Sequence, residues 1–251
     1  MTVVDRAHVP PPVDYPESDG LPIAESDWHR DEMVDLIHRL RVRYEERPDV
    51  YVTGNMFVYY EEGKPASVFA PDVMVVFGVP KTARGVYKLW EEGRAPSVVF
   101  EVSSRKTWRE DRGRKRDLCA RLGVAEYYLW DVRYEYLTPP LQGFRLVAGS
   151  YRPMRADDAG CMASAALGLR LCCEGNRLEL YDCATGEQLR RPADAEAAAR
   201  VAVAQAREAA QAARQAADAE RAARTAAEAE VVRLRGEIAR LHAEGGEGGR
   251  G

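Results

Sequence analysis

The segment from Ala70 to Asp131 constrains the fold of this chain more than any other part of the sequence. It contains two apolar runs rich in Val and Phe, Val73–Val79 and Val98–Val102, which are too short for helices and therefore predict strands buried on at least one face. Asp72 precedes the first run and Glu101 interrupts the second. An ionised carboxylate in an apolar strand is costly unless a cation or hydrogen bonds compensate it. The two acids together therefore predict a divalent metal site.

A helix and a third strand follow these runs. The basic segment from about Trp108 to Leu122 is followed by Gly123, a residue that commonly ends helices. Glu126–Trp130 is again short and largely apolar, which predicts a buried strand. A strand, a helix and a strand in this order indicate a crossover between parallel neighbours. We therefore expect an α/β fold with one mixed sheet flanked by helices.

Other segments add a helix and shorter strands to this sheet. The apolar positions of Trp28–Tyr44 recur at helical spacing, which predicts an amphipathic helix that packs on the sheet. Gly175-Asn176 is a strong signal for a two-residue hairpin turn. We therefore expect an antiparallel extension of the sheet beyond Asp131. The further strands are expected at Tyr51–Tyr60, Tyr134–Leu137, Phe144–Val147, Leu169–Glu174 and Arg177–Asp182.

Composition divides the chain of 251 residues into four parts. Residues 1–22 are rich in proline and predict a flexible leader, and residues 23–191 contain the folded domain. Residues 193–243 are rich in alanine and predict one helix, about 75 Å long at 1.5 Å per residue. The glycines of residues 244–251 predict a disordered tail.

The alanine-rich helix carries a heptad pattern. Arginine recurs every seven residues from Arg200 to Arg221 and again at Arg235, which favours a coiled coil. Most seam positions are alanine, which buries little apolar area. A weak dimer and a lone helix therefore both remain open. The larger apolar seam residues are Val231, Leu234, Ile238 and Leu241.

The charge of the chain is acidic overall, with a formal net charge of −4. This balance lowers the expectation of tight, nonspecific nucleic-acid binding. A local group of cations near the basic helix can still supply DNA phosphate contacts, and the alternative for these side chains is a solvated helix face. The group consists of Arg105, Lys106, Arg109 and Arg112.

The cysteines and the apolar runs bear on the cellular compartment. Five cysteines, an odd number without a CxxC pair, predict reduced thiols. No apolar run is long enough to span a membrane, and the N-terminus lacks the pattern of a signal peptide. We therefore expect a cytoplasmic protein with no membrane association.

Asp72 and Glu101 are of the residue type through which Mg²⁺ binds, because this ion is usually held by one or two carboxylates. A bound ion makes water easier to deprotonate, and a nearby lysine can orient that water or balance charge on the phosphate. Lys106 and Lys115 are the candidates for this lysine. Asp111 lies four residues before Lys115, so an i,i+4 salt bridge is the alternative role for Lys115.

Several spaced motifs carry a resemblance to a known family. They are Pro71-Asp72, Glu101-Val102-Ser103-Ser104, Thr107, Asp111, Lys115, Gly123-Val124-Ala125-Glu126-Tyr127 and Asp131. In this order they resemble the Uma-two family of endonucleases, in the restriction-endonuclease-like PD-(D/E)xK superfamily. The resemblance covers roughly Trp28 to Leu189, and the family also has a C-terminal helix rich in Ala, Glu and Arg.

The resemblance implies a restriction-endonuclease-like mixed sheet flanked by helices, and hydrolysis of DNA phosphodiester bonds by a metal-activated water. It implies that Asp72 and Glu101 bind Mg²⁺ or Mn²⁺, with the Val102 carbonyl as a third ligand. The usual lysine position of the superfamily, two residues after the glutamate, holds Ser103 in this chain. Lys115 on the following helix fits a displaced catalytic lysine.

The same resemblance suggests supporting residues. Asp111 fits the acid that precedes the displaced lysine. Ser103 and Thr107 are better suited to hydrogen bonding or helix capping than to nucleophilic attack, because no histidine is near them in sequence. An additional acid from the first helix is common in the superfamily, and Glu32 or Asp35 would fill that role.

These observations favour a metal-dependent DNA endonuclease. Two cuts on opposite strands need two active sites, so we expect a homodimer for double-strand cleavage. The alternative is a noncatalytic scaffold that keeps the fold and binds partners through the long helix; the displaced lysine favours it, whereas retention of both acids favours the enzyme. A nuclease that acts on RNA or on flaps would use the same site.

Overall fold

The computed structural model describes residues 13–18, 20 and 26–247, and it describes side chains as far as Arg240. Most of the expected leader and the last four residues of the expected tail lie outside the described residues. The helices are α1 (Asp27–Arg43), α2 (Leu89–Glu92), α3 (Trp108–Glu110), the π-helical turn η1 (Asp111–Lys115), α4 (Arg116–Leu122) and α5 (Pro192–Glu247).

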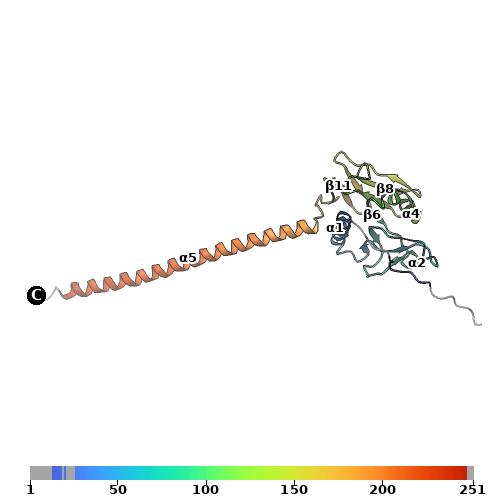
Figure 1. Ribbon diagram of the computed structural model, residues 1–251. Coiled ribbons are helices and arrows are strands. Elements are labelled where there is room, and N and C mark those ends of the chain that lie inside the picture. The colour runs from blue at the N-terminus through green and yellow to red at the C-terminus, as the bar shows by residue number, and fades with distance from the viewer. Residues whose placement is uncertain (1–12, 19, 21–25, 248–251) are drawn as a thin grey trace, which may run out of the picture. The chain divides into compact units, whose positions relative to one another are not determined.

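The strands form one large and two small sheets (Figure 1). The large sheet has the order β1 (Val50–Thr53), β4 (Val73–Phe77), β6 (Val98–Val102), β7 (Glu126–Trp130), β8 (Leu141–Val147) and β9 (Ser150–Pro153). The first small sheet contains β10 (Cys161–Ser164), β11 (Leu169–Glu174) and β12 (Arg177–Asp182). The second contains β3 (Val68–Phe69), β2 (Val58–Tyr59) and β5 (Tyr87–Lys88).

The large sheet is mixed, as the sequence predicts. β6 and β7 are parallel and joined by the helical segment α3–η1–α4, whereas every other neighbouring pair is antiparallel. The apolar runs expected as strands at Val73 and Val98 are its central strands β4 and β6. The expected α/β architecture, a mixed sheet flanked by helices and followed by a long C-terminal helix, is therefore confirmed.

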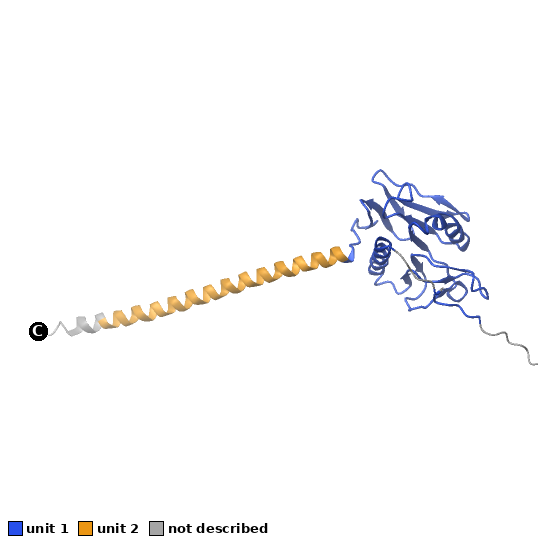
Figure 2. Cartoon of the chain, in the orientation of Figure 1, with its two compact units in different colours: residues 1–192 blue, residues 193–251 orange. Residues whose placement is uncertain are grey.

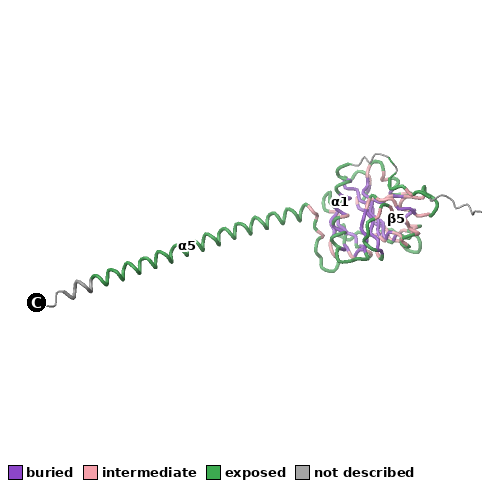
Figure 3. The backbone as a smooth tube through the Cα atoms, turned by 90° about the horizontal axis from the view of Figure 1, so that it is seen from below, coloured by how far each residue is buried: buried purple, intermediate pink, exposed green. Residues whose placement is uncertain are grey.

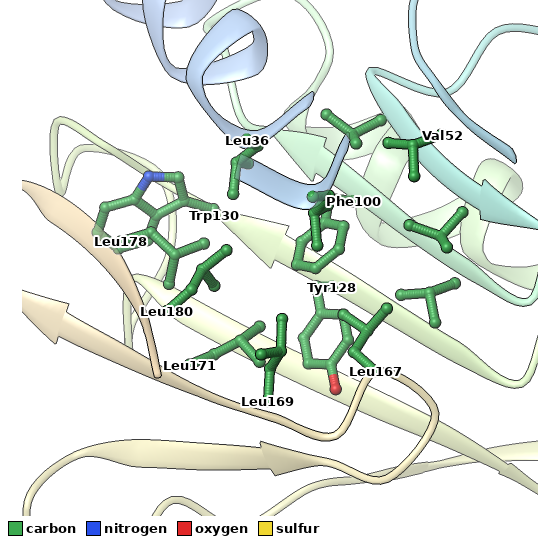
Figure 4. Packing of buried hydrophobic residues seen from close by; sticks show 14 of the residues in the cluster. Leu36, Val52, Phe100, Tyr128, Trp130, Leu167, Leu169, Leu171, Leu178 and Leu180 are labelled. Atoms are coloured by element: carbon green, nitrogen blue, oxygen red, sulfur yellow. The ribbon is translucent and has the colours of Figure 1, made fainter. Parts of the chain in front are cut away.

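Both faces of the large sheet are buried, which explains why its central strands are apolar throughout. On one face, Val73 and Val75 join Leu36 of α1 and the leucines of β11 and β12 in one cluster. On the other face, Met74 and Val76 pack with residues of α4 and of the small sheet that contains β2. Figure 4 shows the first cluster, in which the leucines of β11 and β12 pack toward Phe100, Tyr128 and Trp130.

The antiparallel extension differs in part from the expectation. β8 and β9 extend the large sheet, but the hairpin of β11 and β12 belongs to a separate sheet that covers it. The hairpin turn at Gly175-Asn176 is present as predicted, because Glu174 pairs with Arg177. Periodicity predicts the strands of this hairpin but not the sheet that they join.

Two expected strands are wrong, each for a local reason. Tyr51–Tyr60 divides into β1 and β2, because the chain turns at Gly54, where a Cβ atom would lie 1.9 Å from the Asp72 carbonyl oxygen. Tyr134–Leu137 forms no strand. The backbone N–H groups of Tyr136 and Leu137 instead donate to the Asp131 carboxylate.

The expectation that all cysteines are reduced is also wrong. Cys161 and Cys172 form a disulfide, because they lie directly opposite each other in the antiparallel pair β10–β11 with Cα atoms 4.2 Å apart. The cysteine spacing does not show this pairing, since it depends on strand register. Cys119, Cys173 and Cys183 are free thiols.

The chain divides into two units, residues 1–192 and 193–251 (Figure 2). In the first unit, the Tyr59 hydroxyl donates to the Pro16 carbonyl, and Tyr15 packs edge-on against the Tyr59 ring. The second unit is α5, whose described side chains from residue 193 to residue 240 are all exposed (Figure 3). No described helix has the length and apolar character needed to cross a membrane.

Candidate active site

The two acids predicted as metal ligands lie side by side on neighbouring strands, where β4 begins and β6 ends. The antiparallel register of β4 and β6 pairs Val73 with Phe100, which brings Asp72 opposite Glu101. The Val102 N–H donates to Asp72 Oδ2 at 2.7 Å, and the Asp72 N–H donates to Glu101 Oε2 at 3.3 Å. The strand register thus fixes both carboxylates relative to each other.

Lys115 completes a buried cluster with these acids. Its ammonium group donates to Glu101 Oε2 at 2.8 Å and to the Ala70 carbonyl at 3.2 Å, and it lies 3.0 Å from Asp111 Oδ1. The first two contacts are hydrogen bonds, and the contact with Asp111 is an ion pair. The salt bridge with Asp111 and the contact with Glu101 therefore exist together. We call Asp72, Glu101, Asp111 and Lys115 the site cluster.

The π-helical turn η1 begins at Asp111 and ends at Lys115, so both helical members of the site cluster lie at its ends. The Tyr127 hydroxyl, from β7, donates to the Asp111 carbonyl at 2.8 Å and ties this turn to the sheet. Turns of this kind inside helices are frequent at functional sites. The sequence predicts a continuous helix here and does not reveal the wider turn.

The site cluster contains more negative than positive charge, because three carboxylates surround one ammonium group. Burial, assisted by the charges of Asp72 and Asp111 and opposed by Lys115, raises the pKa of Glu101 well above its usual value. Burial alone would lower the pKa of Lys115, but the neighbouring carboxylates outweigh it and raise that pKa. Lys115 therefore stays charged, and its single positive charge can balance only one of the three carboxylates.

His29 of α1 is a member of this site that the sequence did not reveal. Its Nε2 lies 3.1 Å from Asp72 Oδ2, and its side chain is buried. His29 shares the buried face of α1 with Met33, Leu36 and Leu40. That helical spacing is the signal from which a buried histidine could have been predicted.

The carboxylates of the site cluster fit a divalent cation. Glu101 is fully buried, yet among the described residues no group donates a hydrogen bond to its Oε1 or to Asp111 Oδ2. The described residues contain no group of three or more His, Cys, Asp or Glu side chains that could hold a metal. The candidate ligands are therefore the two carboxylates of Asp72 and Glu101 with the Val102 carbonyl, a set typical of Mg²⁺, which keeps several waters.

The acids of α1 belong to a different cluster. Both oxygens of Glu32 accept from the Arg191 guanidinium, at 3.1 and 3.2 Å, and Asp35 pairs with Arg39 and Arg191 at 2.8 Å. Among the described residues, no hydrogen bond or ion pair joins Glu32 or Asp35 to the site cluster. We call Glu32, Asp35, Arg39, Glu179 and Arg191 the arginine cluster.

The remaining candidates lie beside the site cluster in sequence. Ser103 is buried, and its N–H donates to the Trp130 carbonyl at 2.7 Å, so its role in the structure is to continue the pairing of β6 with β7. The four cations expected to contact phosphate are all exposed and lie on the segment that follows β6. They are Arg105, Lys106, Arg109 and Arg112.

A cavity of about 600 Å³ lies elsewhere, at the β1 edge of the large sheet, and no member of the site cluster lines it. Its cations already have partners. Lys81 donates to the carbonyls at the end of α1, Arg84 pairs with Glu92, and Arg41 donates to the Val52 carbonyl. The lysine and arginines of this cavity are therefore already paired within the protein.

The fold is of the restriction-endonuclease-like class. A family model named Uma2 and described as "Putative restriction endonuclease" matches residues 9–174, more than half of the chain. The chain therefore belongs to the Uma2 family, which confirms the resemblance seen in its motifs.

No curated protein matches the chain. Among solved structures, the chain is similar to a crystal structure of "a putative nuclease belonging to DUF820 from Anabaena variabilis ATCC 29413", at 10% sequence identity and a TM-score of 0.43, over 58% of this chain and 76% of that chain.

Proposed function

We propose that this chain is a metal-dependent endonuclease that hydrolyses phosphodiester bonds in DNA. The observation that carries the proposal is the site cluster, in which the buried carboxylates of Glu101 and Asp111 contact one lysine beside the partly buried Asp72. Among the described residues, Glu101 Oε1 and Asp111 Oδ2 have no partner. Such a surplus of buried negative charge is costly in the absence of a cation. Membership of the Uma2 family supports the same conclusion.

Asp72, Glu101 and the Val102 carbonyl are the groups that would hold Mg²⁺ or Mn²⁺. A bound divalent ion supplies Lewis acidity, which lowers the pKa of water and balances charge on the phosphate. His29 and the Val102 N–H both contact Asp72 Oδ2, and these contacts orient the Asp72 carboxylate. Positioned ligands of this kind strengthen metal binding.

Lys115 is the proposed catalytic lysine. Its raised pKa keeps it charged at neutral pH, so it can donate to a phosphate oxygen or to the attacking water but cannot act as a base. Its contacts with Glu101, Asp111 and Ala70 hold the ammonium group beside the metal ligands. Lys115 on the helical segment would thus supply the cation that residue 103, a serine in this chain, cannot supply.

The test is cleavage of supercoiled plasmid and of a labelled single strand by the full-length protein with Mg²⁺, Mn²⁺ or EDTA. We expect metal-dependent cutting that Asp72→Ala and Lys115→Ala each reduce at least about 100-fold, the usual scale for losing one charge-stabilising group. Glu32→Gln is the matched control, because Glu32 is a buried acid that belongs to the arginine cluster.

Cutting that is unchanged in Asp72→Ala would contradict this proposal. Absence of cutting on every substrate would favour the scaffold alternative and direct attention to α5. Circular dichroism of each variant checks that a lost activity does not reflect a lost fold.

The proposal includes a homodimer formed through α5. Its larger apolar seam residues Val231, Leu234 and Ile238 are exposed in the single chain, and burying them against a second copy would stabilise a dimer. We expect sedimentation equilibrium to give a dimeric mass for the full chain and a monomeric mass for a chain that ends at Pro192. Equal monomeric masses would contradict the dimer.

A further inference from the structure

Two aromatic side chains lie together beside the site cluster. Trp108 is the first residue of α3, and Tyr136 lies in the segment that follows β7. Their rings are nearly parallel, with an angle of 18° and centroids 6.3 Å apart. Both side chains remain partly exposed. We call this pair the aromatic platform.

A buried carboxylate holds the Tyr136 half of the platform in place. Asp131 is fully buried and accepts hydrogen bonds from the N–H groups of Tyr136 at 2.5 Å, Leu137 at 2.9 Å and Arg133 at 3.2 Å. The side chain of Leu137 is itself buried. The segment that carries Tyr136 is therefore fixed before any ligand binds.

The Trp108 half is fixed by the start of the helical segment. The Trp108 N–H donates to the Ser104 carbonyl at 3.1 Å, and the Ser104 hydroxyl accepts from the Thr107 N–H at 3.3 Å. Trp108 thus precedes Asp111 by one helical turn, on the same continuous segment as η1. Both rings are preorganised, which reduces the entropy lost when a ligand stacks on them.

The platform and the site cluster lie at the same end of the parallel strands β6 and β7. β6 and β7 are parallel, and Val102 at the end of β6 pairs with Trp130 at the end of β7. The segments that carry Trp108 and Tyr136 leave the sheet from these two neighbouring ends. Glu101 lies one residue before the end of β6, so Glu101 and the platform belong to the same end of this strand pair.

Positive charge accompanies the two rings. The Arg109 guanidinium lies 4.7 Å from the centre of the Trp108 ring. Glu135 raises the pKa of the Tyr136 hydroxyl through a hydrogen bond, and Arg133 and Arg105 are near enough to oppose that rise. Arginine beside an exposed aromatic ring is the usual composition of a surface that binds a single strand, because the ring stacks a base and the cation contacts phosphate.

We infer that the aromatic platform stacks an unpaired base of single-stranded DNA beside the site cluster. In a duplex both faces of a base are covered by its neighbours, so an aromatic ring gains a stacking partner only where the strand is unpaired. The inference rests on the proposed function, since it names the form of DNA that the site accepts. It predicts selection by strand state, with little dependence on base sequence.

The test measures binding in EDTA, so that hydrolysis is not required. Anisotropy of labelled oligothymidylate and of a duplex of equal length is recorded with the full-length protein. We expect tighter binding of the single strand, which Trp108→Ala and Tyr136→Ala each weaken about 5- to 150-fold, while duplex binding is unchanged. Trp108→Phe keeps a stacking ring and should retain most of the affinity.

Trp90→Ala is the matched control, because Trp90 also packs on a tyrosine, Tyr15, but belongs to α2. Unchanged single-strand binding in both alanine variants would overturn the inference, and so would an equal loss for single strand and duplex. A protein that shows the expected pattern in EDTA but never cuts DNA would contradict the proposed catalysis and leave the platform supported.

Discussion

The site cluster and the arginine cluster are both buried, and each contains three carboxylates, yet they differ in how those carboxylates are compensated. In the arginine cluster, two guanidinium groups contact all three acids, and both oxygens of Glu32 and of Glu179 have partners. In the site cluster, one ammonium group contacts two of the three acids, Glu101 and Asp111, and Glu101 Oε1 has no partner among the described residues. The difference lies in the cations and not in the acids.

This difference separates a structural cluster from a functional one. A guanidinium group has five donors in a planar fork, so two arginines can satisfy three carboxylates without any ligand. A lysine has three donors, and Lys115 uses one of them on a backbone carbonyl. Each acid of the arginine cluster therefore has an arginine contact, although Arg39 Nε has no hydrogen-bond partner among the described residues, whereas the site cluster leaves acceptors for a cation. Variants of the two clusters can test this distinction.

The largest effect on stability is expected from Arg191→Met. Arg191 contacts Glu32, Asp35 and Glu179, so its removal leaves three buried acids with one cation. Breaking a buried ionic network in this way typically costs about 3–5 kcal/mol in the free energy of unfolding. Urea unfolding monitored by circular dichroism measures this change. We also expect Mn²⁺ to raise the melting temperature of Arg191→Met as it does that of the original protein, because the site cluster is intact in this variant.

The neighbouring Arg190→Met is the control, because Arg190 is exposed and lies one residue away in sequence. An equal stability of the two variants would show that the arginine cluster is not structural. Loss of the Mn²⁺ shift in Arg191→Met alone would instead connect this cluster with the metal.

The sequence predicts the site cluster better than it predicts the surroundings of that cluster. Asp72 and Glu101 stand out because an acid at an apolar strand is unusual, and their strands are central in the sheet. Nothing in the sequence shows that Glu32 lies outside the site cluster. Its partner Arg191 is 159 residues away in the chain, and only the tertiary fold brings the two side chains together. A sequence therefore reveals an acid that breaks a pattern, but it does not reveal which distant cation compensates an acid.

The same limit applies to the fold. β6, β7 and the helical segment between them follow from local apolar patterns and a terminal glycine. The segment near Tyr136 contains strand-forming residues, yet the buried Asp131 carboxylate takes its N–H groups. Local propensity cannot predict this competition, because the position of the Asp131 carboxylate depends on β7, the preceding strand, which pairs with β6 and β8.

Replacing a buried glutamate by glutamine should change the free energy of unfolding in opposite directions in the two clusters. Because burial raises the pKa of Glu101, the folded state binds a proton more tightly than the unfolded state does, and Glu101 lowers stability as pH rises above its usual value of 4.5. Glu101→Gln should therefore stabilise the protein in EDTA at pH 7, by about 0.5–2 kcal/mol, and abolish cleavage.

Glu179→Gln is the matched variant in the arginine cluster. It removes a charge that Arg39 and Arg191 compensate, so we expect it to destabilise the protein. Chemical unfolding of both variants in EDTA decides the matter. If Glu101→Gln destabilises the protein as Glu179→Gln does, the site cluster has no surplus of negative charge.

The smallest effect is expected at Asp182, which lies at the end of β12 and pairs with Arg43 of α1 at 2.6 Å. The N–H groups of Ala184 and Thr185, and Arg43 to a lesser extent, hold the pKa of Asp182 below its usual value of 3.8. A lowered pKa in the folded state contributes stability that is present above pH 3.8 and is lost as pH falls through the folded value. We therefore expect Asp182→Asn to lower the melting temperature slightly at pH 7, and the difference from the original protein to shrink as pH falls toward 3. If the difference in melting temperature between the two proteins does not change with pH, the charge of the Asp182 carboxylate contributes nothing to stability. Solvent would then screen the Asp182–Arg43 ion pair, unlike the buried ion pair between Arg39 of α1 and Glu179 of β12.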